Sequence, residues 1–458
     1  EAAYDRTSAC RFTSFPAYEY TNTASISNRH RNVIFANSVV PRRPVSYFEA
    51  RTPYQLWSQL KDVCRDADHD CNVVSLPHNS NLSNGHLFDP LSYREEGVDE
   101  LEYAELRAEM EPVTEMFQHK GDSECRNGFA TVEAEEDPFC GFEKLRAADV
   151  ETCGDETGSG GMRLGGCVHR RDFVRNVLKE GLAEEQRLGL NPYAFGFIGS
   201  TDTHNGTPGY VDDRDFQGHV GLVDDDVEKR LGPGTITHDS LINNPGGLAA
   251  VWAEENTRES IFGAILRRET FATSGPRLRI RLFGGWDALP EDLCIREDGL
   301  EIAYADGVPM GGVLPPRAAE PAPRFFVNAV WDEGTAQSPG TRLERLQIIK
   351  GWLDEDGVLR ERVVDVVTFE GEAPMVDDQT CQTNGAGETS FCAVWTDPDF
   401  DPDASAFYYA RVIEGPSCRW SQRQCLALAD PKPEGCTNGR VPTTVQQRAW
   451  SSPVWYRP

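Results

Sequence analysis

Long apolar runs are missing from this sequence. No stretch reaches the ~18 consecutive apolar residues of a membrane-spanning helix, so no membrane span is expected. Basic residues are also scarce, because 45 lysines and arginines stand against 74 aspartates and glutamates, a formal net charge of −29. Such a surface repels phosphate backbones, which argues against nucleic acid as a partner. With 458 residues, the chain is long enough for two or three domains with their own cores.

Several short motifs of common sites are absent as well. No C-x-x-C pair occurs among the 13 cysteines, which argues against a zinc ribbon. The sequence also has no G-x-S-x-G nucleophile elbow, no P-loop and no dinucleotide-binding fingerprint. Its chemistry must therefore be sought in residues that are dispersed along the chain.

Cysteines, in contrast, are frequent and fall in loop-like stretches. Cys294 looks isolated, and the odd total leaves one thiol free or paired elsewhere. This usage favours a disulfide-bearing protein of the periplasm or the extracellular space. The sequence opens on EAAYDRTSAC, without a signal peptide or an initiator methionine, so we expect the start either to have been removed or not to be included. The clusters are Cys64 with Cys71; Cys125, Cys140, Cys153 and Cys167; Cys381 with Cys392; and Cys418, Cys425 and Cys436.

Residues 1–275 alternate between strand and helix patterns, which predicts an α/β domain with a parallel sheet or barrel. The clearest helix is 170–189, ending at Gly189, and Thr257 is a plausible N-cap of another helix. Residues 121–167 interrupt the alternation with four cysteines and an acidic run, and we interpret them as a disulfide-tied insertion over the barrel mouth. The predicted strands are 12–21, 71–79, 112–118 and 193–204, and the other predicted helices are 52–67, 99–110 and 257–269.

Residues 276–458 have a different pattern. Apolar residues alternate with period two in segments such as PRLRIRLFGGW and AFYYARVIEG, and Gly, Pro and Asp turns separate these segments. This is typical of an antiparallel, sandwich-like β domain.

One segment, FGFIGSTDTHNG, ends an apolar run in Asp202 and His204. Side chains two apart on a strand face the same side, so this pair would point together at a strand's C-terminal end, where α/β barrels keep their active sites. An Asp–His pair suits zinc, manganese or iron. The alternative is a helix cap beside a structural histidine.

Other predicted strands end in similar residue types. His78 follows an apolar run, Glu19 lies between aromatic residues, and His30 precedes another apolar stretch. Glu115 lies on the predicted strand 112–118, where a salt bridge to Lys120 is the alternative to metal ligation. A buried carboxylate is costly unless it is paired or metal-bound, so these residues point to one shared cation cluster.

Further polar residues have two interpretations each. Lys120 begins KGDSE, a turn that could receive an anionic group or could simply be solvated. Asn79 and Asn81 could orient a ligand or form ordinary turns. Three histidines carry no spacing signal, and we expect them to be structural: His119, His219 and His238.

The segment TDPDFDPDA places acids at every second position, from Asp397 to Asp403, and so invites a calcium interpretation. An EF-hand loop needs glycine and glutamate where this chain has Pro402 and Tyr408. A series of Pro-Asp turns is the favoured interpretation, and calcium is the alternative.

Several longer motifs together resemble a poorly characterised bacterial domain family, placed in the PHP (polymerase and histidinol phosphatase) superfamily of metal-dependent phosphoesterases. They are HRNVIF, PHNSNLSNG, KGDSE, GFIGSTDTH, TSGPRLRIRLFGGW, YYARVIEGPSCRW and RAWSSPVWY. The resemblance spans almost the whole chain and implies a distorted (β/α)7 barrel with two or three metal ions at its strand ends. Glu19 resembles the bridging carboxylate, and His30 and His78 resemble the middle-motif histidines. Asp202 and His204 resemble the closing Asp-x-His pair.

The sequence departs from that pattern at its start. PHP barrels begin with a His-x-His motif, and none occurs here. We therefore expect a partial barrel at 1–275, whose first strands are cleaved off, absent or supplied by a separate N-terminal fragment.

The resemblance implies a secreted bacterial hydrolase of phosphate or phosphonate esters that uses a metal-bridging hydroxide. Its catalytic residues would be Glu19, Asp202 and Lys120, and its substrate a small-molecule ester. The alternative is a non-enzymatic extracellular protein in which a degenerate barrel supports the C-terminal domain. The metal ligands would be Glu19, His30, His78, Glu115, Asp202 and His204, holding zinc, manganese or iron.

Overall fold

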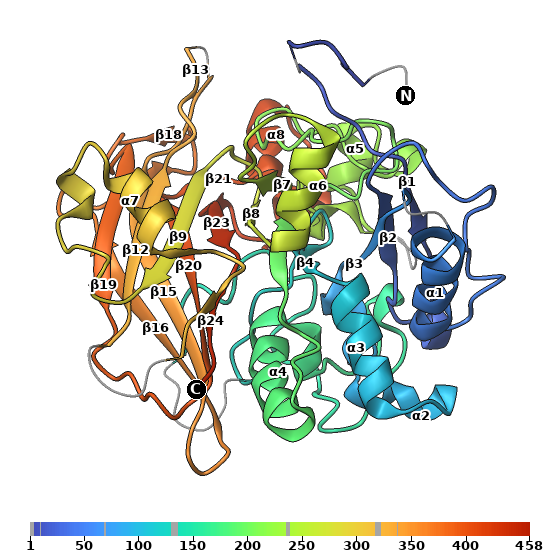
Figure 1. Cartoon of the computed structure of the whole chain (residues 1–458). Helices are drawn as coiled ribbons and strands as arrows, with labels where there is room; N and C mark the ends of the chain where they lie inside the picture. Colours follow the sequence, from blue (N-terminus) through green and yellow to red (C-terminus); the bar gives the residue numbers. More distant parts are fainter. Residues whose placement is uncertain are drawn as a thin grey trace.

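The computed structural model describes residues 4–9, 11–67, 70–129, 136–234, 239–316, 322–336 and 338–458. It is a mixed α/β protein in which helices and short strands of the N-terminal half lie beside long antiparallel strands of the C-terminal half (Figure 1). The helices are α1 (Pro53–Leu60), α2 (Tyr93–Glu96), α3 (Glu100–Met110), α4 (Val174–Leu188), α5 (Val227–Leu231), α6 (Arg258–Arg267), α7 (Gly299–Asp306) and α8 (Trp420–Ala427).

Two small sheets form the strand framework of the N-terminal half. β1 (Ala17–Tyr20), β2 (Arg31–Phe35) and β3 (Val73–Pro77) make an antiparallel sheet, whereas β4 (Val113–Gln118) pairs parallel with β6 (Gly196–Gly199) and antiparallel with β5 (Gly121–Asp122). Among the named strands of the described residues in this half, the expected parallel pairing is found for β4 and β6. The ten residues between β1 and β2 are too few for the crossover that parallel strands need.

Local signals place the helices close to their predicted positions. The side chain of Thr52 accepts a hydrogen bond from the Gln55 amide at the start of α1, where Pro53 opens the helix. Thr257 caps α6 in the same way, through the Ser260 amide. Gly189 ends α4 with a φ of +77°, in the left-handed region that glycine tolerates. The capping predictions at Thr257 and Gly189 are confirmed.

The C-terminal half consists mainly of antiparallel sheets whose inner faces share one apolar core. The core includes Ile280, Phe325, Ile348 and Tyr408, which are all buried. The strands from residue 248 onward are β7 (Leu248–Val251), β8 (Thr270–Thr273), β9 (Arg279–Gly285), β10 (Val308–Pro309), β11 (Val313–Leu314), β12 (Arg324–Val330), β13 (Gly334–Thr335), β14 (Ser338–Pro339), β15 (Leu343–Leu353), β16 (Leu359–Thr368), β17 (Val376–Asp377), β18 (Gln382–Thr383), β19 (Ser390–Thr396), β20 (Ala406–Glu414), β21 (Ser417–Cys418), β22 (Thr444–Val445), β23 (Arg448–Ser451) and β24 (Val454–Tyr456).

The largest sheet crosses the expected boundary at residue 275. β8 lies before the boundary and pairs with β23 near the end of the chain, and β23 pairs in turn with β20. β7 and β8 therefore belong to the same sheet as the C-terminal strands, so the two halves share backbone hydrogen bonds as well as side-chain contacts.

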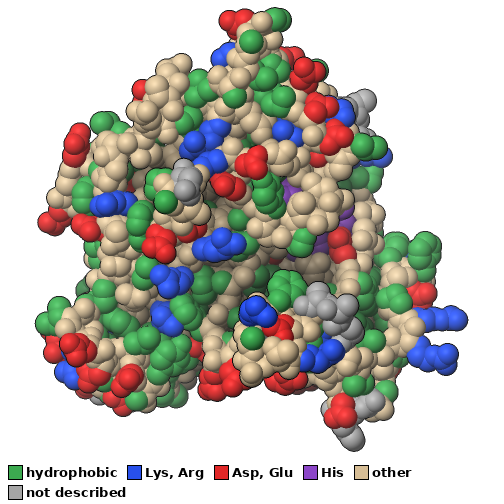
Figure 2. All heavy atoms as spheres, turned by 90° about the horizontal axis from the view of Figure 1, so that it is seen from above, with side chains coloured by type: hydrophobic (Ala, Val, Ile, Leu, Met, Phe, Trp, Pro, Cys, Tyr) green, Lys and Arg blue, Asp and Glu red, His purple; other side chains and the backbone are tan. Residues whose placement is uncertain are grey.

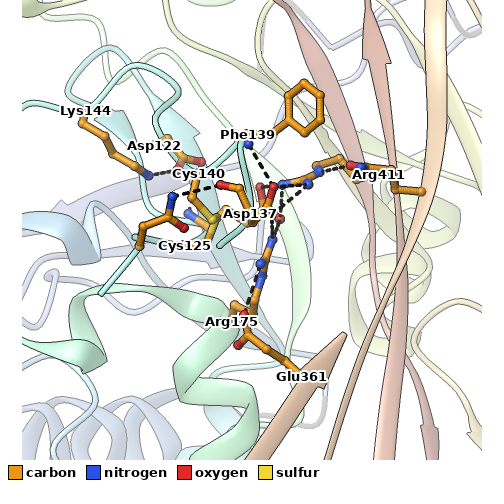
Figure 3. The surroundings of a disulfide bond; sticks show 12 residues. Asp122, Cys125, Asp137, Phe139, Cys140, Lys144, Arg175, Glu361 and Arg411 are labelled. Carbon is orange, nitrogen blue, oxygen red and sulfur yellow. Dashed lines mark hydrogen bonds and ion pairs between the residues drawn. A yellow bond between two sulfur atoms is a disulfide. The ribbon is translucent and has the colours of Figure 1, made fainter. Parts of the chain in front are cut away.

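A buried charge cluster also joins the halves, beside the Cys125–Cys140 disulfide (Figure 3). Arg411 on β20 contacts both carboxylates of the cluster, 2.9 Å from Glu124 and 2.9 Å from Asp137. Arg175 on α4 pairs with the same two carboxylates. All four side chains are at most 3% exposed, so each charge depends on its partners rather than on water.

Six disulfides join described residues: Cys64–Cys71, Cys125–Cys140, Cys153–Cys167, Cys294–Cys392, Cys381–Cys418 and Cys425–Cys436. The disulfide-bearing class is confirmed. The apparent isolation of Cys294 is a local feature only, because its partner lies 98 residues away on β19. Within the described ranges, no helix combines the length and apolarity needed to cross a bilayer.

Candidate metal centre

The first cluster of candidate ligands lies at one edge of the β1–β2–β3 sheet. His30 immediately precedes β2 and His78 immediately follows β3, and the antiparallel pairing brings them together: the His78 amide donates to the His30 carbonyl at 3.4 Å. Glu19 on the adjacent β1 places its Oε1 2.7 Å from His30 Nδ1 and 3.6 Å from His78 Nε2. Three residues in or next to three different strands thus form one ligand triad, although at least eleven positions of sequence separate each from the others.

A second triad lies at the carboxyl ends of β4 and β6. These strands are parallel neighbours, so the residues that follow them, His119 and Asp202, emerge at the same edge. His119 Nε2 lies 3.5 Å from Asp202 Oδ2, and His204 completes the triad from the exposed side. Gln118 also donates to Asp202 Oδ2, at 2.9 Å, and Lys120 forms an ion pair with the same oxygen.

Asp202 and His204 lie close together, but alternation along a strand is not the cause. β6 ends at Gly199, so neither residue is in a strand and the predicted strand to residue 204 is too long. Asp202 instead adopts a φ of +52°, a left-handed conformation that few residues other than glycine take. Such strain in a non-glycine residue is characteristic of functional sites.

Both triads line one cavity of about 490 Å³. Its polar wall includes Glu19 and His30 from the first triad, all three residues of the second, and Lys120. Figure 2 looks into this region from above, where histidine side chains lie in a recess with acidic side chains beside them. The remaining wall residues are Thr21, Leu82, Leu145, Met162, Arg163, Leu164, Val220, Asp239, Ile242 and Asn243.

Several buried imidazole nitrogens in this region have no hydrogen-bond partner: His30 Nε2, both nitrogens of His78 and both nitrogens of His119. Buried polar atoms are rarely left unsatisfied, because each one costs ~1–3 kcal/mol. Imidazole nitrogens and carboxylate oxygens are ligands for zinc, manganese and iron. The donor set and its unsatisfied nitrogens therefore fit a centre for divalent metal ions.

Electrostatics keep three of these groups, Glu19, Asp202 and His119, in the protonation states that ligate metals. Burial alone would raise the pKa of Glu19, but His30 and His78 outweigh burial and hold it well below its ordinary value. Burial likewise opposes ionisation of Asp202, and Lys120 and His119 reverse the effect and lower its pKa. Burial, aided by Lys120, lowers the pKa of His119 to about 3, so this ring is neutral.

Comparison with protein families identifies one match, and it spans residues 1–458: the family described as "Protein of unknown function (DUF3604)". The chain belongs to the DUF3604 family. No curated protein and no solved structure matches it.

Glu115 of this DUF3604 chain lies behind the two triads and is not a member of either. Its Oε2 accepts the Asn79 amide at 2.9 Å, and its Oε1 accepts the Ser200 hydroxyl. Burial raises its pKa to about 7, although the nearby His78 opposes the rise. The alternative ion pair with Lys120 does not form, because Lys120 pairs with Asp202 instead.

Two histidines expected to be structural lie at the site. His119 is a triad member, and the ring of His219 lies 5.5 Å from that of His119 while its carbonyl accepts the His204 amide at 2.7 Å. The structure therefore places His119 among the candidate metal ligands, which the absence of a spacing signal did not predict. A signal existed, because His119 follows its strand as directly as His78 follows β3. His238 lies outside the described residues.

The two asparagines near His78 differ in their roles: Asn79 is free to orient a ligand, whereas Asn81 stabilises a turn. Asn79 has a φ of +56°, and both polar atoms of its buried side chain lack partners, as expected for a group that would orient a ligand. Asn81 donates to the Lys120 carbonyl at 2.9 Å and so holds the turn that carries Lys120.

Three of the acids of the TDPDFDPDA segment have partners within the protein. Asp397 is buried, 2.6 Å from Lys350 Nζ and 2.7 Å from the Tyr408 hydroxyl, and Asp399 pairs with Arg362. Asp401 accepts the Asp403 amide at 2.9 Å, as in an Asx-turn. Protein groups thus engage the carboxylates of Asp397, Asp399 and Asp401, which favours the Pro-Asp turn interpretation over the calcium interpretation.

Among the described residues, a further group has metal-ligand residue types: Cys125, Asp137 and Cys140. Both sulfurs are joined in a disulfide and Asp137 pairs with Arg175 and Arg411, so its donors are already engaged (Figure 3).

Proposed function

We propose that this protein is a metal-dependent hydrolase of phosphate or phosphonate esters, built on a partial PHP-type barrel and working outside the cytoplasm. The observation that carries the proposal is the convergence of two ligand triads on one cavity, with unpartnered buried imidazole nitrogens. The six disulfides support an oxidising compartment.

Each triad would hold one divalent ion, zinc, manganese or iron. Glu19, His30 and His78 would form one ligand set, and His119, Asp202 and His204 the other. When bound, such ions lower the pKa of coordinated water towards ~7 and neutralise negative charge on ester oxygens. Glu115, neutral at acidic pH and hydrogen-bonded at the rear of the site, would support the ligands rather than bind metal itself.

Lys120 would be the cationic contact for the ester. Its side chain is 22% exposed and lines the cavity, whereas its carbonyl is fixed by Asn81 and its amide donates to Gln118 Oε1 at 2.6 Å. The ammonium group of Lys120 forms an ion pair with Asp202 at the edge of the second triad. An anionic oxygen of the ester could contact the same ammonium group there. A fixed cation placed where negative charge develops stabilises the transition state.

Elemental analysis together with a hydrolysis assay tests the proposal. We expect about two equivalents of transition metal per chain, and metal-dependent release of 4-nitrophenol from bis(4-nitrophenyl) phosphate or 4-nitrophenyl phenylphosphonate. Chelation should abolish turnover, and added zinc or manganese should restore it. Protein that binds no metal and hydrolyses neither ester after metal addition would favour the alternative, a non-enzymatic extracellular scaffold.

A further inference from the structure

A loop of the insertion supplies a distinct part of the cavity wall. Met162, Arg163 and Leu164 are consecutive and all three line the cavity, together with Leu145 from the same insertion. None of them belongs to a metal triad. Glycine pairs flank the three residues on both sides, in the sequence GGMRLGG at 160–166. We call residues 160–166 the GMRLG loop.

Asn84 holds the GMRLG loop in place and connects it to Ser27. Its Oδ1 accepts the Gly161 amide at 2.7 Å and the Ser27 hydroxyl at 2.7 Å, and its Nδ2 donates to the Cys167 carbonyl at 2.6 Å. Cys167 is joined to Cys153, which closes the insertion directly behind the loop. The loop is therefore anchored at both ends.

Two of the glycines are required by close packing. A Cβ on Gly161 would lie 2.2 Å from the Leu82 carbonyl oxygen, and a Cβ on Gly166 would lie 1.9 Å from the Ser159 carbonyl oxygen. Leu164 lies between them with a φ of +56°, a strained conformation for a leucine. Close packing thus fixes the backbone that carries the three cavity-lining side chains.

Arg163 is a charge without a counter-charge. Among the residues that the structure describes, no hydrogen bond or ion pair involves its side chain, and it is exposed at the cavity wall. Lys120, the other cation of the cavity, is already paired with Asp202. In a chain with a net charge of −29, an unpaired guanidinium held in place beside apolar groups is a ready receptor for a carboxylate or a phosphate.

We propose that the GMRLG loop selects the substrate: an ester with an apolar aryl or alkyl group that carries a second anionic group away from the bond to be cleaved. Arg163 binds that second anion, and Leu145, Met162 and Leu164 pack against the apolar part. This inference rests on the proposed hydrolase function, because it concerns how the same cavity chooses its ester.

Two matched phosphonates test the inference: 4-nitrophenyl phenylphosphonate and its analogue with a carboxylate on the phenyl ring. We expect the wild type to have the lower KM for the carboxylated ester. Arg163→Met, which keeps the length but removes the charge, should raise that KM about tenfold or more, since charge-assisted hydrogen bonds contribute ~1.5–3 kcal/mol. Its kcat and its KM for the plain ester should change less than twofold, and Arg163→Lys should recover part of the loss.

Two further variants separate recognition from folding. Gly161→Ala, which would displace the loop, should raise the KM for the carboxylated ester in the same way while leaving the metal content unchanged. Arg11→Met, a substitution of a highly exposed arginine outside the cavity wall, should change neither KM.

A binding measurement keeps the two proposals apart. Calorimetry with 4-carboxyphenylphosphonate and phenylphosphonate on metal-loaded protein needs no turnover, and Arg163→Met should remove the tighter binding of the carboxylated ligand. Hydrolysis of both esters with equal KM, and no effect of Arg163→Met on either measurement, would overturn the recognition role and leave the hydrolase intact. Absence of hydrolysis by metal-loaded wild type would overturn the hydrolase, and calorimetry would still decide the role of Arg163.

Discussion

His30 Nδ1 lies 2.7 Å from Glu19 Oε1, and His78 joins them only because β2 and β3 run antiparallel. The contact links the first residue before β2 to the middle of β1, and its geometry depends on two strand registers at once. A shift of one residue in either register would turn one of the ligands to the opposite face of the sheet. The candidate triad of Glu19, His30 and His78 is thus a product of strand pairing.

The exposed edge of the second triad offers the cleanest test of metal binding. His204→Ala should lower metal affinity about tenfold or more and abolish ester hydrolysis, with little change in the unfolding midpoint, because His204 is exposed and follows the end of its strand. Thr207→Ala, in the same loop and also exposed, is the control. Unchanged metal content and turnover in the His204 variant would remove the Asp202–His204 pair from the mechanism.

Glu115 should make the stability of the chelated protein depend on pH. Its folded pKa of about 7 is raised above the ordinary 4.5, so its contribution to stability is complete below pH 4.5 and is lost as the pH rises to about 7. Glu115→Gln keeps the amide and hydroxyl contacts available but cannot ionise. At pH 8 in chelator, this variant should be more stable than wild type by up to about 3 kcal/mol in denaturant titrations, with a much smaller gain at pH 5.

The same variant separates the two roles considered for Glu115. A supporting group should leave the metal stoichiometry unchanged in Glu115→Gln, whereas a direct ligand should cost the protein one bound ion. A gain in stability that is equal at pH 5 and pH 8 would show that the carboxyl group does not titrate as expected.

The buried charge cluster should stabilise the contact between the two halves and so raise the free energy of unfolding. Glu124→Gln leaves Arg411 and Arg175 with less negative charge in a region closed to water, so we expect a loss of about 3 kcal/mol or more in the free energy of unfolding. The pKa of Glu124 is lowered, since Arg411 and Arg175 outweigh the opposite effect of burial. Its contribution is therefore present above pH 4.5 and is lost as the pH falls towards the folded pKa.

An exposed ion pair provides the matched control for that loss. Glu100→Gln removes a partner of Arg187, 2.7 Å away, whose side chain is 47% exposed, and should cost less than about 1 kcal/mol. Equal losses from the two substitutions would mean that burial adds nothing to the Glu124 cluster.

Loop length should rank the disulfides by their contribution. Removing Cys294–Cys392, which closes 98 residues, should lower the free energy of unfolding by about 4–5 kcal/mol in the chain-entropy model, and removing Cys425–Cys436, which closes 11, by about 3 kcal/mol. Paired Cys→Ser variants in denaturant titrations measure the two losses. A larger loss from the shorter loop would show that local packing outweighs chain entropy here.

The sequence by itself determined the local elements and most of the ligand residues. Period-two alternation placed β9, β12, β15 and β20, and capping residues such as Thr257 and Gly189 placed helix ends. His30, His78 and Asp202 could be recognised because strand ends are visible in neighbouring residues. All of this information lies within a few positions of each residue, where propensity, capping and periodicity act.

Only the tertiary structure decided which distant residues meet. It put His119 beside Asp202, joined Cys294 to Cys392, paired β8 with β23 across the expected boundary, and gave Asp202 its left-handed backbone. These features depend on strand order, register and packing between segments far apart in the chain, and no local pattern encodes them. The same reason explains why Asp397 and Asp399 look like calcium ligands in the sequence yet pair with Lys350 and Arg362 in the fold.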